Sequence, residues 1–201
     1  MHDEPPPRRC ALLLAAATTP ALALAGNSLV DAGRPVAVAH DTLTVTPDRE
    51  WNKLGWRPGL RCDRWTLDGE ALNSVTFCGA IESGRPMFRE VSKHDQPLPH
   101  FSTTMLLTDV PDLVEKSYRI ALGVSLMTID SAEPAQLDGE RAIRFRYTFT
   151  RQDEEVERHG EAVATIRCKK LYWISYEAPA IYYYARDLES WRRLAATARF
   201  R

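Results

Sequence analysis

The sequence predicts an α+β domain in which a single antiparallel β-sheet is flanked by helices, after a cleaved signal peptide. Three observations predict this class: an apolar run near the N-terminus, a series of strand-like segments in the second half, and helical periodicity before and after that series. We therefore expect residues 1–25 to be the signal peptide, 26–35 a short leader, and 36–201 one domain.

The N-terminal segment has the three parts of a secretory signal peptide. Arg8 and Arg9 precede the apolar run ALLLAAATTPALALA, which ends in the small-residue cleavage site Ala23-Leu24-Ala25. The run is shorter than the roughly 20 apolar residues of a membrane helix, and Pro20 interrupts it. We expect a periplasmic or secreted protein without a membrane span.

Composition and motifs exclude several function classes. Lys and Arg number 26 against 27 Asp and Glu, so there is no basic field that would attract nucleic acid. No Gly-x-Ser-x-Gly elbow, phosphate loop or dinucleotide fingerprint follows the signal segment. We predict no catalytic residues, no cofactor and no nucleic-acid partner.

The first elements after the leader are strands. Residues 35–46, PVAVAHDTLTVT, alternate β-branched with small and polar residues and predict one strand. Residues 62–78 predict a hairpin around Asp68-Gly69. A two-residue loop there would separate Trp65 from Val75 and Phe77, whereas a three-residue loop keeps these apolar side chains on one face. We favour the three-residue loop.

That hairpin also decides how the cysteines are arranged. The register that unites the apolar residues puts Cys62 and Cys78 on a common face, and directly opposed residues lie about 4.5 to 5.5 Å apart at Cα, within reach of a disulfide. A register shifted by one further pair would place them diagonally and out of reach. Because export implies an oxidising compartment, we predict a Cys62–Cys78 disulfide and a free, buried thiol at Cys168.

The second half predicts a helix, a meander of strands and a final helix. In residues 107–123 the apolar side chains recur at helical spacing, with Pro111 in the first turn and Gly123 at the end. Four strand-like runs follow, separated by turn signals at Asp138-Gly139, near Gln152-Asp153 and at Lys169-Lys170. The stretch ARDLESWRRLAATAR predicts a terminal helix that covers the sheet.

Two polar groups are weak candidates for chemistry. His94, Asp95 and His100 lie in the Pro-rich loop KHDQPLPH, which has suitable metal ligands but no established zinc spacing, so a solvated loop is the default and no metal is predicted. The run 155–161 alternates Glu155, Glu157, His159 and Glu161, and an exposed polar sheet face explains it best.

An aromatic cluster is the best candidate contact surface. Tyr182, Tyr183 and Tyr184 stand just before the last helix and cannot all point inward. Packing between sheet and helix is the leading explanation of the cluster, and contact with a ligand or partner is the functional one. We expect Tyr183 or Tyr184 to be substantially exposed, and Trp173 or Trp191 to be in the core.

The order of elements and three short motifs resemble the PsbP-like α/β/α sandwich family over residues 36–200. The motifs are found in LDGERAIRFRYTF, LYWISYEAPA and WRRLAATARF, at Gly139, Ala142, Phe145 and Tyr147, then Tyr172, Ile174, Tyr176, Ala178 and Pro179, then Ala198 and Phe200. The chain also resembles uncharacterised exported bacterial proteins that carry WNKL and WTLDG elements. The resemblance implies an accessory, binding or assembly protein without catalysis.

Two function classes therefore compete. The leading one is an exported, non-catalytic periplasmic binding or assembly accessory protein, whose partner is an unknown envelope protein or a small ligand. The alternative is a periplasmic hydrolase or small-ligand carrier that uses a cleft between sheet and helix, with His94, His100 or His159 as its titrating group. A pocket that places one of these histidines beside an acid or a nucleophile would favour the alternative.

Overall fold

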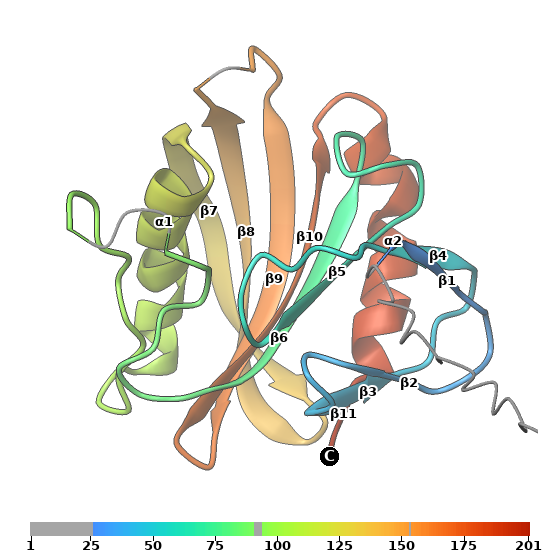
Figure 1. The fold of residues 1–201 in the computed structure, drawn as a ribbon, viewed down its shortest axis with the longest axis horizontal. Coiled ribbons are helices and arrows are strands. Elements are labelled where there is room, and N and C mark those ends of the chain that lie inside the picture. Colours follow the sequence, from blue (N-terminus) through green and yellow to red (C-terminus); the bar gives the residue numbers. More distant parts are fainter. Residues whose placement is uncertain (1–25, 91–93, 153) are drawn as a thin grey trace, which may run out of the picture.

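The computed structural model describes residues 26–90, 94–152 and 154–201, so the predicted signal peptide lies outside the described residues. Figure 1 shows the chain as a sheet with one helix on each side. The elements are β1 (Ser28–Val30), β2 (Val36–Val38), β3 (Leu43–Val45), β4 (Trp51–Lys53), β5 (Cys62–Thr66), β6 (Ser74–Ile81), the 3-10 turn η1 (Leu107–Asp109), α1 (Val110–Ala121), β7 (Val124–Leu137), β8 (Glu140–Arg151), β9 (Arg158–Arg167), β10 (Lys170–Pro179), α2 (Tyr183–Ala196) and β11 (Arg199–Phe200).

The main sheet has eight antiparallel strands in the order β1-β4-β5-β6-β10-β9-β8-β7. The predicted meander is confirmed, because β7, β8, β9 and β10 are neighbours in sequence and in the sheet. The predicted helices are confirmed as α1, with Pro111 in its first turn, and as α2. β1 lies inside residues 26–35 and pairs with β4, so the segment expected to be a leader contributes an edge strand.

Residues 35–46 form a hairpin, and the expectation of one strand was wrong. β3 pairs with β2 on one side and with β11 on the other, in a separate three-stranded sheet. The chain reverses at Ala39, His40 and Asp41, which all have positive φ. The Thr42 hydroxyl donates to the Ala39 carbonyl at 2.7 Å, and the Ala39 amide donates to buried Asp63 at 2.9 Å. A contact with a distant strand therefore fixes a turn that has no glycine to mark it.

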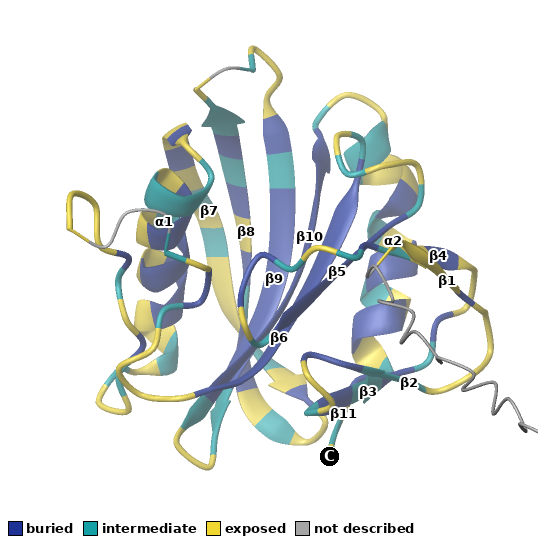
Figure 2. Cartoon of the chain, in the orientation of Figure 1, coloured by how far each residue is buried: buried dark blue, intermediate teal, exposed yellow. Residues whose placement is uncertain are grey.

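The two faces of the main sheet carry separate hydrophobic cores, which makes the fold an α/β/α sandwich. On one face Leu113, Val114 and Tyr118 of α1 pack against a cluster that includes Trp173. On the other face Trp191 and Leu194 of α2 pack against a second cluster, which also takes in the small sheet. Figure 2 shows that the central strands between the helices are the most completely buried.

The β5–β6 hairpin confirms the predicted disulfide and corrects the predicted loop. Cys62 lies opposite Cys78 in the register, their Cα atoms are 4.1 Å apart, and the two residues form a disulfide. Trp65 pairs with Val75 on the α2 face, as expected. The loop is longer than three residues, because β5 ends at Thr66 and β6 begins at Ser74. The Asn73 amide oxygen accepts from the Leu67 backbone at 2.7 Å, so a buried side chain shapes this loop.

Candidate functional site

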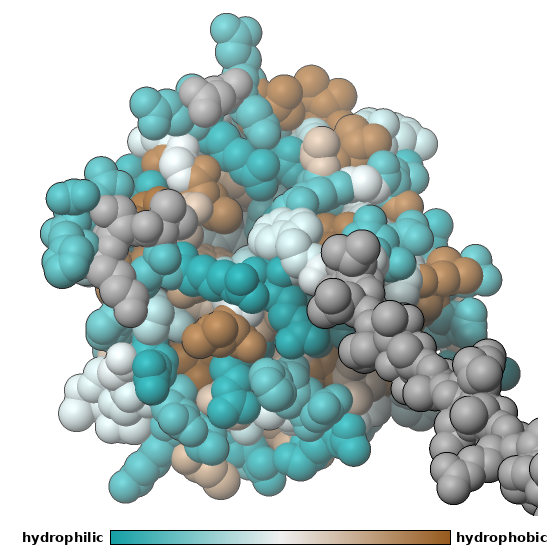
Figure 3. All heavy atoms as spheres, in the orientation of Figure 1, coloured by the Kyte–Doolittle hydropathy of each residue, from teal (hydrophilic) through white to brown (hydrophobic). Residues whose placement is uncertain are grey.

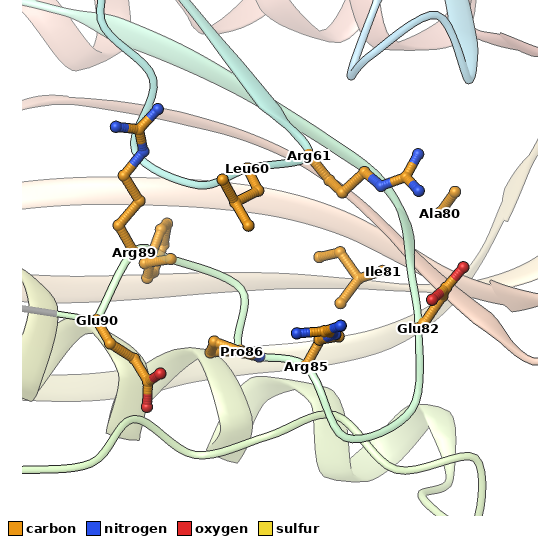
Figure 4. A pocket seen from close by; sticks show the side chains of 10 residues that line it. Leu60, Arg61, Ala80, Ile81, Glu82, Arg85, Pro86, Arg89 and Glu90 are labelled. Carbon is orange, nitrogen blue, oxygen red and sulfur yellow. The ribbon is translucent and has the colours of Figure 1, made fainter. Parts of the chain in front are cut away.

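Two adjoining hollows lie on the α1 face of the sheet, and together we call them the front groove. The first hollow, of about 590 Å³, lies between Leu60-Arg61, the end of β6 and residues 82–90 (Figure 4). The second, of about 690 Å³, lies between residues 55–58, Phe88-Arg89 and the C-terminal end of α1. Phe88 and Arg89 belong to both linings, so the two hollows adjoin.

The loop that forms the groove is fixed from behind. A Cβ atom on Gly59 would come within 2.2 Å of the Met87 carbonyl oxygen and 2.9 Å of the Cys62 sulfur, so only glycine fits there. The Arg89 amide donates to the Pro58 carbonyl at 2.8 Å. The disulfide at Cys62 holds the end of the loop against β6. The groove is therefore a preformed surface, which lowers the entropic cost of binding.

Apolar side chains make the floor of the groove and part of its rim. Ile81 and Phe88 are buried in the floor, whereas Trp56 and Leu60 are 46% and 72% exposed on the loop above it. Figure 3 shows that hydrophobic side chains on this face of the molecule are ringed by hydrophilic ones. Exposed apolar groups beside a hollow are typical of contact surfaces.

Arginines dominate the charge of the groove. Within the described residues, no hydrogen bond or ion pair holds the side chains of Arg61, Arg85 and Arg89, which surround the first hollow in Figure 4. Arg57, in the second hollow, is 3.3 Å from Asp63. Glu82 lies on the rim, 3.7 Å from Lys170. The groove thus presents guanidinium groups whose donors are available to an acidic partner.

Behind the second hollow lies a buried charge network. Arg64 lies over the ring of Trp56 at 5.5 Å, and Tyr118 contacts Phe88 edge-to-face at 5.7 Å. The Tyr118 hydroxyl donates to Glu177 at 2.5 Å, and the other Glu177 oxygen is 3.6 Å from Arg64. Burial, and then the negative charge of Glu177, raise the pKa of Tyr118 well above its usual value. This phenol therefore stays protonated and anchors the wall of the groove.

Sequence reasoning missed the front groove, because its residues come from separate segments that only the fold brings together. One local signal was available in the stretch GWRPGLR at 55–61. It combines Gly and Pro with two arginines, a tryptophan and a leucine, a composition more apolar and cationic than an ordinary surface turn needs.

The exposure of the three tyrosines differs from the prediction. Tyr182 is 65% exposed, whereas Tyr183 and Tyr184 are both half-buried against the α2 core, so the expectation that one of these two is substantially exposed was wrong. Tyr184 stacks on Tyr176 with ring centroids 5.7 Å apart, and the Tyr176 hydroxyl donates to the Tyr183 carbonyl at 2.7 Å. Packing between sheet and helix therefore accounts for two of the three rings.

The exposed ring of Tyr182 is held by the start of α2. Arg186 lies over the Tyr182 ring at 5.4 Å and the Tyr183 ring at 4.9 Å. The same guanidinium donates to Asp68 and, at 2.5 Å, to the buried carboxylate of Asp187. Ile181 is 83% exposed beside Tyr182. These two residues form a small apolar patch, distinct from the front groove.

A third hollow, of about 270 Å³, lies between the sheet and α2. It is lined by Asp130, Arg146, His159 and Tyr184, so the structure brings one predicted histidine close to an acid. His159 contacts the Tyr184 ring at 5.2 Å and is 3.1 Å from Glu157. Burial raises the pKa of Tyr184 to about 12, so its phenol is neutral at physiological pH.

The expectation that residues 155–161 form an exposed strand face was wrong. β9 begins only at Arg158, so Glu155 and Glu157 precede the strand. Glu161 is fully buried and makes a bidentate pair with Arg192 of α2, at 2.6 and 3.0 Å. The carboxylate joins the helix to the sheet.

The remaining candidates do not line these hollows, although His100 lies next to a residue of the first one. Among the described residues, no group of three or more His, Cys, Asp or Glu side chains is arranged to hold a metal, and this includes His94, Asp95 and His100. His100 lies 3.8 Å from Glu90. Cys168 is free but exposed, which corrects the expected buried thiol: it occupies the β9–β10 turn, where Cys168 and Lys169 both have positive φ.

Comparison with known proteins identifies the fold. No protein-family model matches the chain, and no curated protein matches it in sequence. Cyanobacterial PsbP from Synechocystis is similar in structure, with a TM-score of 0.54 at 16% identity, over 92% of this chain and 98% of that one. A Bacteroides thetaiotaomicron protein has a TM-score of 0.48 at 11% identity, over 84% of this chain and 48% of that one. A Pseudomonas aeruginosa protein of unknown function has a TM-score of 0.46 at 11% identity, over 78% and 95% of the two chains.

The structure also bears on the membrane. Within the described ranges, no helix is both long and apolar enough to cross a bilayer. The similarity to cyanobacterial PsbP spans nearly the whole of both chains. At this level of identity the similarity establishes the fold alone. The chain therefore has the PsbP-like α/β/α sandwich fold.

Proposed function

We propose that the protein is an exported, non-catalytic binding or assembly accessory protein of the periplasm, and that its partner docks on the front groove. The observation that carries the proposal is the groove itself: Arg61, Arg85 and Arg89 surround an apolar floor beside exposed Trp56 and Leu60. Arginine and tryptophan are among the residues enriched at protein interfaces and at their energetic centres.

The charges of the groove favour binding over chemistry. A guanidinium remains protonated at any physiological pH, so it can hold an anion but cannot act as a general base. The acids of the first hollow both lie beside basic side chains, Glu82 at 3.7 Å from Lys170 and Glu90 at 3.8 Å from His100. The groove is thus equipped to recognise negative charge and apolar surface together.

Export is supported by two independent features. The Cys62–Cys78 disulfide is typical of proteins that fold in an oxidising compartment. The pattern of residues 8–25 is that of a cleaved signal peptide. We therefore place the mature protein in the periplasm or outside the cell.

The test is co-purification from the envelope after cross-linking, with identification of the bound proteins. We expect the double variant Arg61→Glu, Arg85→Glu to lose a protein that the unmodified chain retains, because charge reversal repels an acidic partner. Arg141→Glu is the matched control, since Arg141 is an exposed arginine that does not line the groove. Equal recovery of every protein by the double variant and the control would refute docking on the groove.

A second candidate function is carriage of a small polar ligand in the third hollow. Asp130 and Arg146 offer opposite charges there, beside the imidazole of His159 and the neutral phenol of Tyr184. Such a set suits a zwitterion. Ligand-observed NMR with free amino acids tests it: binding that His159→Ala abolishes would support a carrier, and no binding by any amino acid would remove this candidate.

A further inference from the structure

The two hollows of the front groove are parts of one continuous surface. Phe88 and Arg89 line both of them, so these two residues form a boundary that the hollows share. Phe88 is 4% exposed, and its ring is fixed between Tyr118 and Trp173 at 5.7 and 5.9 Å. A rigid ring thus joins the two floors, and the exposed Arg89 guanidinium stands beside both.

We infer that the groove takes one extended acidic peptide segment of a partner protein, which places an apolar side chain in each hollow and carboxylates against the arginines of the rim. The inference rests on the proposed function and specifies its ligand. Extended segments present their side chains as separate anchors to neighbouring pockets, and this suits two hollows that share a boundary.

The first hollow fits an aliphatic anchor with acidic neighbours. Its apolar lining is Leu60, Ile81 and Pro86, a set without polar side-chain atoms, and Arg61 and Arg85 stand on opposite sides of it in Figure 4. Burying an apolar side chain there would also cover Leu60, which is more exposed than Trp56, the other exposed apolar residue of the loop.

The second hollow fits a larger apolar side chain. Trp56, Pro58 and Leu122 give it an aromatic and aliphatic lining. Trp56 is held in place at two points: its ring lies against the Arg64 guanidinium, and its indole N–H donates to Glu70 at 3.1 Å. A ring that is already oriented loses little freedom when a ligand packs on it.

Charge and shape favour a peptide over a lipid surface. The side chains of Arg61, Arg85 and Arg89, which have no hydrogen-bond or ion-pair partner within the described residues, surround a concavity, and exposed Glu82 lies on the same rim, where it would repel a dense layer of anionic headgroups. A peptide can place its carboxylates beside the arginines and leave Glu82 in water.

The experiment is selection of random dodecapeptides, displayed on phage, against the folded full chain. We expect the enriched peptides to carry two apolar residues at a constant spacing with Asp or Glu near them. Resynthesised peptides should lose about tenfold or more in affinity when Arg89 is changed to Glu, because this arginine borders both anchors. Arg141→Glu should leave the affinity unchanged.

Anchor variants test whether one segment fills both hollows. Leu60→Ala and Trp56→Ala should each lower the affinity for a peptide with two apolar anchors. If one apolar residue of the peptide is replaced by Ser, only the variant of the hollow that still holds an anchor should lower the affinity further. Enrichment of basic or single-anchor peptides would overturn the inference. The inference would also be overturned if no peptide were selected but the protein bound tightly to phosphatidylglycerol vesicles and the Arg61→Glu, Arg85→Glu variant did not.

These outcomes are separable from failure of the proposed function. If envelope co-purification depends on the groove but no dodecapeptide is enriched, the ligand class is wrong and docking stands. If co-purification is indifferent to the groove variants, the proposed function falls, whatever the peptides do.

Discussion

Glu177→Gln should be among the most destabilising single changes in this chain, although the side chains are nearly equal in size. Glu177 is 1% exposed, accepts from Tyr118 at 2.5 Å and is 3.6 Å from Arg64. Arg64 and Arg158 are themselves only 1% exposed. Neutralising the carboxylate removes the buried counter-charge of Arg64 and leaves it with the part-exposed Glu70 at 3.3 Å, and the expected cost is about 3 to 5 kcal/mol.

A loss of that size corresponds to a fall in melting temperature of roughly 6 to 20 °C for a domain of this length. The assay is urea unfolding at neutral pH followed by far-UV circular dichroism. Tyr118→Phe is the reference: it removes the hydrogen bonds of the hydroxyl to Glu177 and Tyr147 but leaves the charges, and should cost about 1 to 3 kcal/mol. A cost below about 1 kcal/mol for Glu177→Gln would refute the view that this carboxylate compensates buried cations.

Three further predictions concern stability. Replacing Cys62 and Cys78 by Ala should lower the free energy of unfolding by about 3 kcal/mol, since the disulfide spans 16 residues, and an unchanged urea midpoint would contradict this. Trp191→Ala should lower the free energy of unfolding by about 3 to 5 kcal/mol because the side chain is 1% exposed, whereas Tyr182→Ala, at 65% exposure, should change it by no more than about 0.5 kcal/mol. Equal melting temperatures of the two variants would contradict this assignment of core and surface. Burial raises the pKa of Tyr118 above the ordinary value of 10.0, so the contribution of the neutral phenol to stability is complete below about pH 10 and is lost as the pH rises further. The urea midpoint should therefore fall less steeply with alkaline pH in Tyr118→Phe than in the unmodified protein. Parallel pH profiles for the two proteins would contradict this prediction.

The parts of the fold that the sequence predicted are those with strong local periodicity. Strand-like runs separated by turn signals predicted β7 to β10, and residues 141–150 also showed a clear alternation of apolar and polar side chains. The Cys62–Cys78 pairing followed from the alternation of apolar residues in the β5–β6 hairpin, since apolar faces restrict the register of a hairpin.

The parts that it did not predict depend on contacts between distant residues. The hairpin turn at 39–42 needs Asp63 of β5, and the longer β5–β6 loop needs the buried amide of Asn73. Cys168 looked like the end of a strand, but a two-residue turn with positive φ carries it to the surface. At 39–41 and at 168–169, residues other than glycine adopt positive φ, which local propensity disfavours.

The front groove was beyond sequence reasoning for a related reason. Its arginines are neither periodic nor adjacent, and three of them have no partner within the described residues. The close packing of Gly59 against Met87 and the Arg89–Pro58 backbone hydrogen bond bring residues 55–61 over residues 82–90. The aromatic cluster, by contrast, was visible in the sequence, yet Tyr183 and Tyr184 are largely used for packing.

The burial of β10 on both faces bears on how proteins with this architecture can change in length. Its consecutive residues from Leu171 to Pro179 are all buried, and they contribute alternately to the two cores, Trp173 to one and Ile174 to the other. Inserting or deleting one residue there would exchange the side chains of both cores at once. The edge strand β7 has many exposed positions and already contains two register shifts. Descendants of a common ancestor should therefore keep the length of β10 constant and accumulate insertions along β7 and in the turns.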